Sequence, residues 1–358
     1  MFVVTGIPNY PTGEIYEEYK GKKRRDEIID GVKIHRCLTI PRKTGPFFRA
    51  LNYYSFAFFS TLYIRRLKEE FDVVFINQLS PVLMAKAGIV YGRRHKKPTV
   101  LYCLDIWPES LIEGGFSRRS FVYKYIHRIS RIIYRRVDKI LVTSPGFSDY
   151  FEHEFGIKDT MYLPQYAEDF YTPDSCRKVP NGEIHLMFAG NIGTAQGVHT
   201  LIKAVRLLDD IKNLYLHIVG AGSELERIKD MAKDMPNVIF HGIRPAGEMP
   251  AYFSLADACV VTLKSGALSS TLPGKVQAYL AAGKPIIASA DGITRDTINA
   301  AGCGYCSPAD DVSALAINIR KFITAEKDSL SKNAREYYEK NFSKQTFIEK
   351  LEKALEGK

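Results

Sequence analysis

The chain has 358 residues, of which 46% are hydrophobic and 25% are charged, and this composition is typical of a globular protein rather than of a disordered or membrane-spanning one. Its length favours two domains of roughly 170 residues each. The net charge is +10, and residues 1–172 hold 27 Lys and Arg against 19 Asp and Glu, which indicates an anionic partner. No signal peptide is predicted at Met1, and the scattered cysteines favour a reduced, cytoplasmic protein. Cys303 and Cys306 form a lone CxxC pair without the second half of a zinc site, so no metal is predicted.

The N-terminal half, residues 1–172, alternates short apolar runs with helical patterns, which predicts parallel strands joined by helical crossovers. A tract from Leu163 to Gly182 has no periodicity and several prolines, and we interpret it as the linker between two domains. The predicted strands are 2–5, 32–36, 73–77, 99–104 and 139–144, and the predicted helices lie near 48–70, 80–95, 117–136 and 145–155.

The C-terminal half repeats this alternation and is predicted to form a second domain over residues 173–330. A helical and mostly charged segment, 331–358, follows and is expected to pack back towards the N-terminal domain. The predicted fold class is therefore α/β, with two Rossmann-like doubly wound domains facing across a cleft at the carboxyl ends of their strands. The predicted strands are 184–189, 214–219, 238–242, 259–263, 285–289 and 304–306, and the predicted helices lie near 197–209, 222–234, 248–255, 273–282, 293–301, 311–324 and 329–356.

Two stretches of the C-terminal half have the residues of a phosphate site. A predicted strand runs into the glycine-rich turn Gly190–Gly197, where glycines let a diphosphate approach backbone N–H groups. Residues 264–291 predict a polar loop and a helix that opens at Pro273 and Gly274, and a helix N-terminus favours an anion. Lys275 adds a point charge in the first turn. The alternative is an ordinary loop–helix–strand unit; NAD is disfavoured because no acidic residue ends the next strand.

Carboxylates follow a buried strand of the N-terminal half. Asp105 and Glu109 flank the only tryptophan, Trp107, at the carboxyl end of the predicted strand 99–104. A carboxylate in this position can orient or deprotonate a hydroxyl group. The alternative is that Asp105 caps the following turn.

Two N-terminal segments have the composition of membrane-directed surfaces. Pro46–Leu67 is rich in aromatic residues, including Phe47 and Phe48, between basic residues. Ser117–Lys139 predicts an amphipathic helix whose apolar stripe we expect to pack on the sheet, while its arginines attract an anionic membrane. Nucleic acid is not a predicted partner, because no nucleic-acid-binding motif accompanies the charge. The predicted basic surface consists of Arg118, Arg119, Arg128, Arg131, Arg135 and Arg136.

These motifs, in this order, resemble the retaining glycosyltransferases of family 4, which have the two-domain GT-B fold. The resemblance rests on Asp-x-Trp-Pro-Glu-Ser from Asp105, Phe-Ala-Gly-Asn-Ile-Gly ending at Gly193, Phe-His-Gly ending at Gly242, Pro-Gly-Lys ending at Lys275 and Gly-Lys-Pro ending at Pro285. It covers nearly the whole chain and is strongest with members that build bacterial surface polysaccharides.

The resemblance implies transfer of a sugar from a nucleotide-diphosphate donor, here a UDP-sugar and possibly an N-acetylated one, without metal or another cofactor. It implies a polyprenyl-diphosphate-linked saccharide as acceptor, at the cytoplasmic face of the cell membrane, in O-antigen, capsule or exopolysaccharide synthesis. Asp105, with Glu109, would orient the acceptor hydroxyl. The implied donor-binding residues are Gly190, Asn191, Gly193, Gln196, Gly242, Ile243, Arg244, Lys264, Thr271, Gly274, Lys275 and Gln277.

The sequence also departs from the family pattern. Asn191 and Gln196 stand where the family commonly has Arg and Lys, and Ser270 and Ala278 stand where it has a glutamate pair. The second glutamate normally holds the nucleotide ribose, and Gln277 is the suggested replacement. A first strand, glycine turn and helix are also expected before residue 1. Two alternatives therefore stay open: a truncated, non-catalytic homologue that binds a membrane or partner, and a GT-B sugar-nucleotide epimerase.

Overall fold

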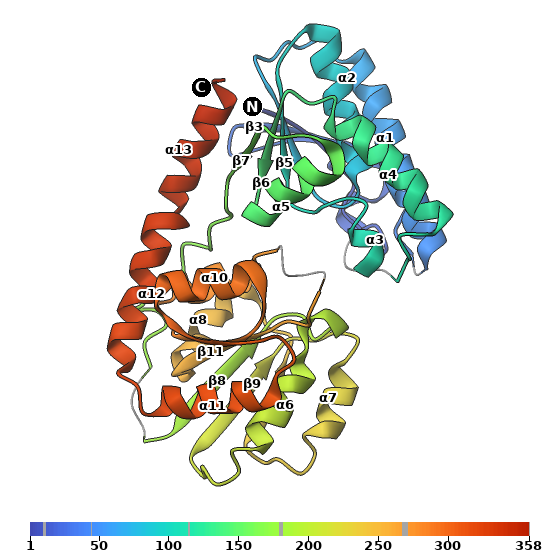
Figure 1. Ribbon diagram of the computed structural model, residues 1–358. Helices are drawn as coiled ribbons and strands as arrows, with labels where there is room; N and C mark the ends of the chain where they lie inside the picture. The colour runs from blue at the N-terminus through green and yellow to red at the C-terminus, as the bar shows by residue number, and fades with distance from the viewer. Residues whose placement is uncertain (10–11, 44, 114, 179–181, 267–270, 358) are drawn as a thin grey trace. The chain divides into compact units, whose positions relative to one another are not determined.

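The computed structural model describes residues 1–9, 12–43, 45–113, 115–178, 182–266 and 271–357 and divides into two compact units (Figure 1). Unit 1 comprises Met1–Val142, Tyr150–Met161 and Lys353–Lys358, and unit 2 comprises Thr143–Asp149 and Tyr162–Glu352. Within the described ranges, no helix has both the length and the apolar character needed to cross a membrane.

Unit 1 contains two sheets among its described residues. In the first, β1 (Phe2–Gly6) pairs parallel with β3 (Val32–Cys37), and β3 pairs antiparallel with β2 (Asp26–Ile29). The prediction of parallel strands alone is wrong at β2, because Asp30 and Gly31 both have positive φ and close a two-residue hairpin. The second sheet has the order β4-β5-β6-β7 and consists of β4 (Val74–Gln78), β5 (Thr99–Cys103), β6 (Lys139–Val142) and β7 (Thr160–Tyr162).

The helices of the first half begin and end close to their predicted bounds. A proline starts α1, and the Ser120 side chain caps α4 by accepting a hydrogen bond from the Tyr123 backbone N. The N-terminal half has η1 (Glu17–Lys22), α1 (Pro46–Arg66), η2 (Val82–Ala85), α2 (Lys86–His95), α3 (Ser110–Glu113), α4 (Phe121–Tyr134), α5 (Pro145–Tyr150) and η3 (Phe151–Phe155).

Unit 2 is built on a parallel sheet of six strands in its described part, with the order β10-β9-β8-β11-β12-β13. Strands β8, β9 and β10 follow one another towards one edge of the sheet, and strands β11, β12 and β13 follow one another towards the other edge. The strand order therefore reverses between the neighbours β8 and β11. Ligands of open α/β sheets bind outside the carboxyl ends of the strands at such a point. The strands are β8 (Ile184–Ala189), β9 (Leu214–Val219), β10 (Val238–Gly242), β11 (Ala258–Thr262), β12 (Ile286–Ser289) and β13 (Gly304–Ser307).

Helices cover both faces of this sheet (Figure 1). One apolar core lies under α6, α7 and α11, and the other lies under α8, α9, α10 and α12. The segment 329–356 is helical as predicted, but it is divided into two helices because the chain breaks at Phe342, which is buried in the second core. The helices are η4 (Thr194–Gln196), α6 (Val198–Arg206), α7 (Leu225–Met231), η5 (Ala246–Glu248), α8 (Met249–Leu255), α9 (Gly274–Ala281), α10 (Gly292–Ala301), α11 (Val312–Ile323), α12 (Lys327–Asn341) and α13 (Lys344–Leu355).

Candidate donor-binding site

A pocket of about 630 Å³ lies in unit 2 at the carboxyl ends of β8 and β9. The start of α9 forms one wall, and the residues that follow β10 form another. This is the position that the reversal of strand order favours for a ligand. The lining residues on which the site depends are Glu168, Gly190, Ile243, Arg244, Gly274 and Lys275.

Lys275 carries a buried positive charge into this pocket. Its residue is partly exposed, but its Nζ is fully buried and has no hydrogen-bond partner among the described residues. The Nζ lies 3.9 Å from the centroid of the Phe188 ring, a cation–π contact that compensates only in part for lost hydration. Burial lowers the pKa of Lys275 to about 7. A buried, unpaired ammonium is costly, and an anionic ligand in the pocket would remove that cost.

Two glycines allow close packing of the backbone at this wall of the pocket, and one of them lies beside the Lys275 ammonium. Gly190 has a φ of 132°, and a Cβ at this position would lie 2.9 Å from the Lys275 Nζ. Gly220 has a φ of 135°, and a Cβ there would lie 1.9 Å from the Gly190 carbonyl oxygen. A side chain at either position would therefore strain the backbone; at Gly190 it would fill the space beside Lys275, and at Gly220 it would clash with the Gly190 backbone. The N-terminus of α9 lies at the same wall, so its free N–H groups add positive potential.

The structure brings most of the predicted donor-binding residues together. Gln277 is buried, and in the amide orientation that satisfies both ends its Nε2 donates to the backbone oxygens of Pro273 (2.9 Å) and Gly274. The amide therefore holds the start of α9. The predicted residues that line the pocket are Gly190, Asn191, Ile243, Arg244, Gly274, Lys275 and Gln277.

Other predicted donor-binding residues lie outside the pocket lining. Lys264 and Gly193 line a separate cavity of about 190 Å³, together with His199, Arg227 and Asp310. Sequence order could not separate these cavities, because the turn that begins at Gly190 has one cavity on each side.

The remaining predicted residues support the turn or lie beside it. The Gln196 Oε1 accepts hydrogen bonds from the Asn191 Nδ2 and the Gly193 N, both at 3.2 Å, and holds the turn closed. Gly242 accepts a hydrogen bond from the Gly220 N. Thr271 is partly buried in the segment before α9, and Ser270 lies outside the described residues.

Sequence reasoning missed one wall of the pocket. Residues 165–168 and Tyr171 line it, although their segment was interpreted as a linker because it lacks periodicity. Glu168 is the one carboxylate among the lining residues, and it is exposed. Across the described part of the chain, no three His, Cys, Asp or Glu residues are placed to hold a metal ion.

Two family models match the chain. "Glycosyltransferase Family 4" matches residues 14–163, and "Glycosyl transferases group 1" matches residues 177–345. The chain is a family 4-like glycosyltransferase with the GT-B fold.

Relatives and solved structures agree with this assignment. WcaI of Escherichia coli (strain K12), named as a colanic acid biosynthesis glycosyl transferase, is 24% identical over 99% of this chain and 91% of its own length. WbjE of Pseudomonas aeruginosa, named as a glycosyltransferase, is 26% identical over 70% of this chain and 66% of its own. The structure of Anabaena Alr3699/HepE in complex with UDP matches with a TM-score of 0.73 and 14% identity over 100% of both chains. The same protein was solved with UDP-glucose.

In unit 1 of this glycosyltransferase, Asp105 is held by hydrogen bonds on both carboxylate oxygens. Its Oδ2 accepts from the Trp107 Nε1 at 3.1 Å and from the Ser80 hydroxyl, and its Oδ1 accepts from the Ser110 hydroxyl. This arrangement fixes the loop after β5 and also leaves a carboxylate at the carboxyl end of the sheet. These contacts agree with both predicted roles of Asp105, which are to orient a hydroxyl group and to cap the following turn.

Glu109 is engaged in the same way by three donors. Its Oε1 accepts from the hydroxyls of Tyr123 (2.6 Å) and Tyr150 (3.0 Å), and its Oε2 accepts from Arg118 at 2.8 Å. Burial, followed by the hydrogen bond to Glu109, raises the pKa of Tyr123. Glu109 therefore joins α4 to neighbouring segments, and Arg118 is partly neutralised.

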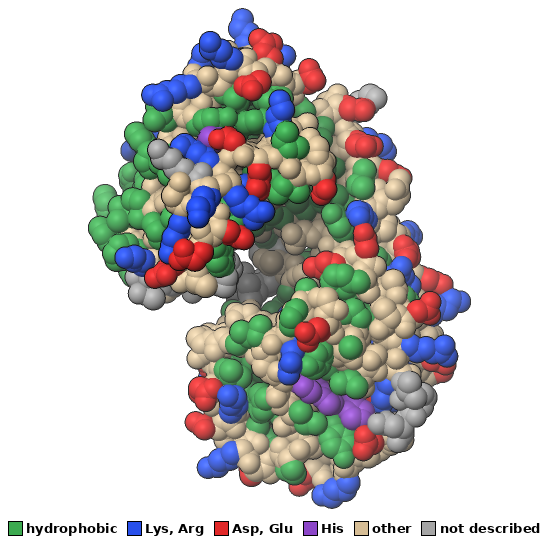
Figure 2. Space-filling model, turned by 180° about the vertical axis from the view of Figure 1, so that it is seen from behind, with side chains coloured by type: hydrophobic (Ala, Val, Ile, Leu, Met, Phe, Trp, Pro, Cys, Tyr) green, Lys and Arg blue, Asp and Glu red, His purple; other side chains and the backbone are tan. Residues whose placement is uncertain are grey.

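The surface of α1 and α4 differs from the prediction. The apolar stripe of α4 was expected to pack on the sheet, but Val122, Tyr125 and Ile132 are exposed. The expectation is wrong for these three residues only: Ile133 of the same stripe is buried beside Tyr123, Ser130 and Tyr134, and Ile126 and Ile129 are half-buried. Hydrophobic side chains interspersed with basic ones are visible on unit 1 (Figure 2). We call the exposed apolar residues of the two helices the aromatic ridge: Phe47, Phe48, Tyr54, Phe58 and Leu62 of α1, and Phe121, Val122, Tyr125 and Ile132 of α4.

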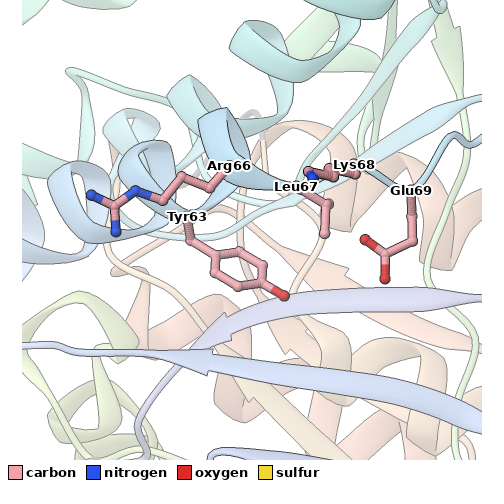
Figure 3. Close-up of a pocket in the computed structure, with 5 residues that line it drawn as sticks. All are labelled: Tyr63, Arg66, Leu67, Lys68 and Glu69. Atoms are coloured by element: carbon pink, nitrogen blue, oxygen red, sulfur yellow. The ribbon is translucent and has the colours of Figure 1, made fainter.

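A further cavity of about 530 Å³ lies at the end of α1 and contains none of the predicted site residues. Tyr63, Arg66, Leu67, Lys68 and Glu69 line it, and Figure 3 shows the Tyr63 ring and the Glu69 carboxylate on the side of the neighbouring strands. Arg66 points away from Glu69 (Figure 3). The lining of this cavity lacks the glycine turn and the buried cation of the pocket beside Lys275.

Proposed function

We propose that the chain transfers a sugar from a UDP-sugar to a lipid-linked saccharide in bacterial polysaccharide biosynthesis. The observation that carries the donor assignment is the buried, unpaired Lys275 Nζ beside Gly190. Solved complexes of a protein with this fold contain UDP and UDP-glucose, and the relatives' names support polysaccharide synthesis. Retention of the anomeric configuration is expected from the resemblance to family 4.

The chemistry requires positive charge where the leaving diphosphate forms. Breaking the glycosidic bond to UDP places negative charge on the β-phosphate, and preorganised donors in a water-poor site stabilise that charge. Lys275 and the first N–H groups of α9 are the groups of the pocket that meet this need. The uracil would lie beside Ile243 and Arg244, since these residues form the wall beyond β10.

Glu168 is the residue that we propose for the ribose. It is the carboxylate of the pocket lining, no ion pair is recorded for it among the described side chains, and Ala278 of the same lining cannot accept a hydrogen bond from a hydroxyl group. Replacing Glu168 with Gln removes the charge and should weaken UDP binding about tenfold, since a hydrogen bond to a charged group contributes about 1.5–3 kcal/mol. Binding of 2′-deoxy and 3′-deoxy analogues of UDP would show whether the lost contact is to a ribose hydroxyl group.

The aromatic ridge supports a position at the membrane. Phe47, Phe58 and Phe121 are 69%, 62% and 83% exposed, and exposed aromatic side chains among arginines are typical of helices that lie in a bilayer interface. We propose that α1 and α4 dock on the anionic inner face of the cell membrane, where a polyprenyl-diphosphate-linked acceptor resides. Replacing Phe47, Phe58 and Phe121 with Ser should release the protein from vesicles.

Calorimetric titration with UDP tests the donor assignment. Lys275→Met keeps the length of the side chain and should weaken UDP binding at least tenfold, whereas Lys264→Met is a matched control because Lys264 lines a different cavity. Equal binding by Lys275→Met and the unmodified chain would remove Lys275 from the site. Equal losses in both variants would mean that the ligand does not occupy the pocket beside Gly190.

Product analysis separates transfer from the two alternatives. A transferase should release UDP only when a lipid-linked saccharide is present, apart from slow hydrolysis. An epimerase should convert the UDP-sugar without any acceptor, and a non-catalytic homologue should bind UDP without turnover.

A further inference from the structure

A second basic cavity lies in unit 1, at the amino ends of β5 and β6. Its volume is about 610 Å³, and its walls come from the end of α2, the end of α4 and the segments that lead into the two strands. Asp105 follows the opposite, carboxyl end of β5, so this cavity is separate from the loop that holds Asp105. The cationic residues of the lining are Arg93, Lys96, Lys97, Arg135 and Arg136.

These cations are not neutralised within the described part of the chain. Arg135 donates to the backbone oxygen of Phe155, at 3.2 Å from Nε and 2.8 Å from Nη2, and so keeps its full charge. Asp138 is the only carboxylate of the lining, and its Oδ2 accepts instead from the backbone N and the hydroxyl of Thr99, at 2.8 and 2.7 Å. Among the described residues, no carboxylate oxygen lies within 4.0 Å of the charged nitrogens of the other four cations.

The backbone that carries the cations is fixed. Lys96 has a left-handed φ of 53°, and the Lys97 backbone N donates to the Gly92 oxygen at 2.9 Å. A Cβ at Gly92 would lie 2.3 Å from the Thr99 Cγ2, so the chain turns tightly against the start of β5. Basic residues at helix C-termini stabilise the helix dipole, which explains one or two of them. The helix dipole does not explain five cations around one cavity. These cations repel one another, and an anion bound between them would relieve that repulsion.

The exposed face of α4 connects this cavity to the aromatic ridge. Phe121, Tyr125, Arg128, Ile132 and Arg135 are spaced four and three residues apart, which places them on one side of the helix, and all of them are exposed. This side alternates apolar and cationic residues and ends at the cavity. Such a face places its apolar groups among acyl chains while its arginines reach the phosphates.

We propose that this cavity binds the phosphate of an anionic phospholipid headgroup while α4 lies on the bilayer. The inference rests on the proposed docking of the aromatic ridge. It adds the class of lipid that is bound and the cavity that binds its headgroup. A membrane surface attracts each nearby cation by about 1 kcal/mol, but a cavity lined by five cations also favours a headgroup that presents its phosphate singly and without a neighbouring positive charge.

Sedimentation with vesicles tests the proposal on the full chain. The unmodified protein should bind vesicles of phosphatidylcholine with phosphatidylglycerol more tightly than phosphatidylcholine alone. The cavity variant carries Arg93→Gln, Lys96→Gln, Lys97→Gln and Arg136→Gln and should bind the anionic vesicles at least tenfold more weakly. The matched control removes four exposed charges of unit 2: Lys203→Gln, Lys212→Gln, Lys233→Gln and Lys340→Gln. It should change binding less than twofold, because those residues lie outside the cavity.

The outcomes separate the cavity from the other proposals. Equal losses in the cavity and control variants, or no preference of the unmodified protein for anionic vesicles, would overturn the inference. Displacement from the vesicles by glycerol phosphate at constant ionic strength, with calorimetric binding that the cavity variant loses, would make it a site for a soluble phosphate and would overturn the lipid assignment. UDP binding and thermal unfolding of the cavity variant should be unchanged. If the variant with Phe47, Phe58 and Phe121 replaced by Ser keeps its vesicle binding, docking by α1 and α4 is wrong. If the unmodified protein does not bind UDP, the donor site is wrong.

Discussion

The Lys275 ammonium lies 3.9 Å from the centre of the Phe188 ring and has no hydrogen-bond partner among the described residues. This contact joins the first turn of α9 to Phe188, the second-last residue of β8. It places one positive charge under the Gly190 backbone, where the proposed diphosphate would lie. The free enzyme therefore carries an electrostatic cost that its donor would relieve, and two predictions test this.

The first prediction is that Lys275→Met stabilises the free protein. The pKa of Lys275 is about 7 in the folded protein and 10.5 without burial, so the unfolded chain binds more protons between these values. Stability contributed by this group therefore falls as the pH drops from 10.5 to 7 and is lowest below 7. Replacing the lysine with Met should raise the free energy of unfolding at pH 7 by about 1–4 kcal/mol, measured by urea unfolding. Lys264→Met should have little effect, and a less stable Lys275→Met protein would contradict the prediction.

The second prediction is proton uptake on UDP binding. A diphosphate beside Lys275 favours the ammonium form and should raise its pKa from about 7. At about pH 8 most of the free protein is neutral at this position, so binding should take up nearly one proton, whereas at about pH 6 uptake from this group should vanish. Calorimetry in buffers with different ionisation enthalpies measures the number. Lys275→Met provides the reference, and uptake that persists in this variant would assign the proton to another group.

The third prediction concerns Asp105. Asn at this position keeps one acceptor but presents an NH₂ group to donors such as the Trp107 Nε1–H and the Ser80 hydroxyl. The mismatch should cost about 1–3 kcal/mol of stability and should lower turnover, while UDP binding in unit 2 stays unchanged. Ser110→Ala is the matched control, since it removes one donor to the same carboxylate. If Asp105 only caps the loop, the two variants should lose turnover in proportion to their stability; if it orients the acceptor, Asp105→Asn should lose much more.

The sequence predicts the parts of the site that depend on local chemistry. Gly190 and Lys275, which line the same pocket, were predicted because a glycine turn after a strand and a lysine at a helix start each have a physical signature. Glu168 was missed because a wall made of irregular chain has no periodicity. Lys264 was placed in the donor site by its neighbours in the sequence, but its side chain lines a different cavity.

The helix α4 shows a second limit of sequence reasoning. Amphipathic spacing identifies apolar positions such as Tyr125 and Ile132, but it cannot tell whether they meet the sheet or the solvent. The structure shows that Tyr123 and Tyr134 fill the core position instead. The β2–β3 hairpin was missed for a similar reason, because Asp30-Gly31 was not read as a turn that reverses the chain.

The last prediction concerns three histidines that form a hydrogen-bonded row across β8, β9 and β10. The His185 Nδ1 lies 2.8 Å from the His217 Nε2, and the His217 Nδ1 lies 2.8 Å from the His241 Nε2. Histidine side chains are visible as a row on unit 2 (Figure 2). His217 can donate through Nε2 to His185 and accept through Nδ1 from His241, which requires a neutral His217 ring.

Protonation breaks this row, so the protein should lose stability in acid. Burial, followed by the charges of His185 and His241, lowers the pKa of His217 to about 4 from 6.5, and burial and Arg244 lower that of His241. The unfolded chain binds more protons between pH 6.5 and 4, so the free energy of unfolding should fall across this window and level off below it. The fall from His217 alone should be about 2–3 kcal/mol, followed by urea unfolding at each pH. His217→Gln should flatten the profile, since Gln donates and accepts hydrogen bonds without titrating. The same slope in His217→Gln and the unmodified protein would show that other groups control the acid response.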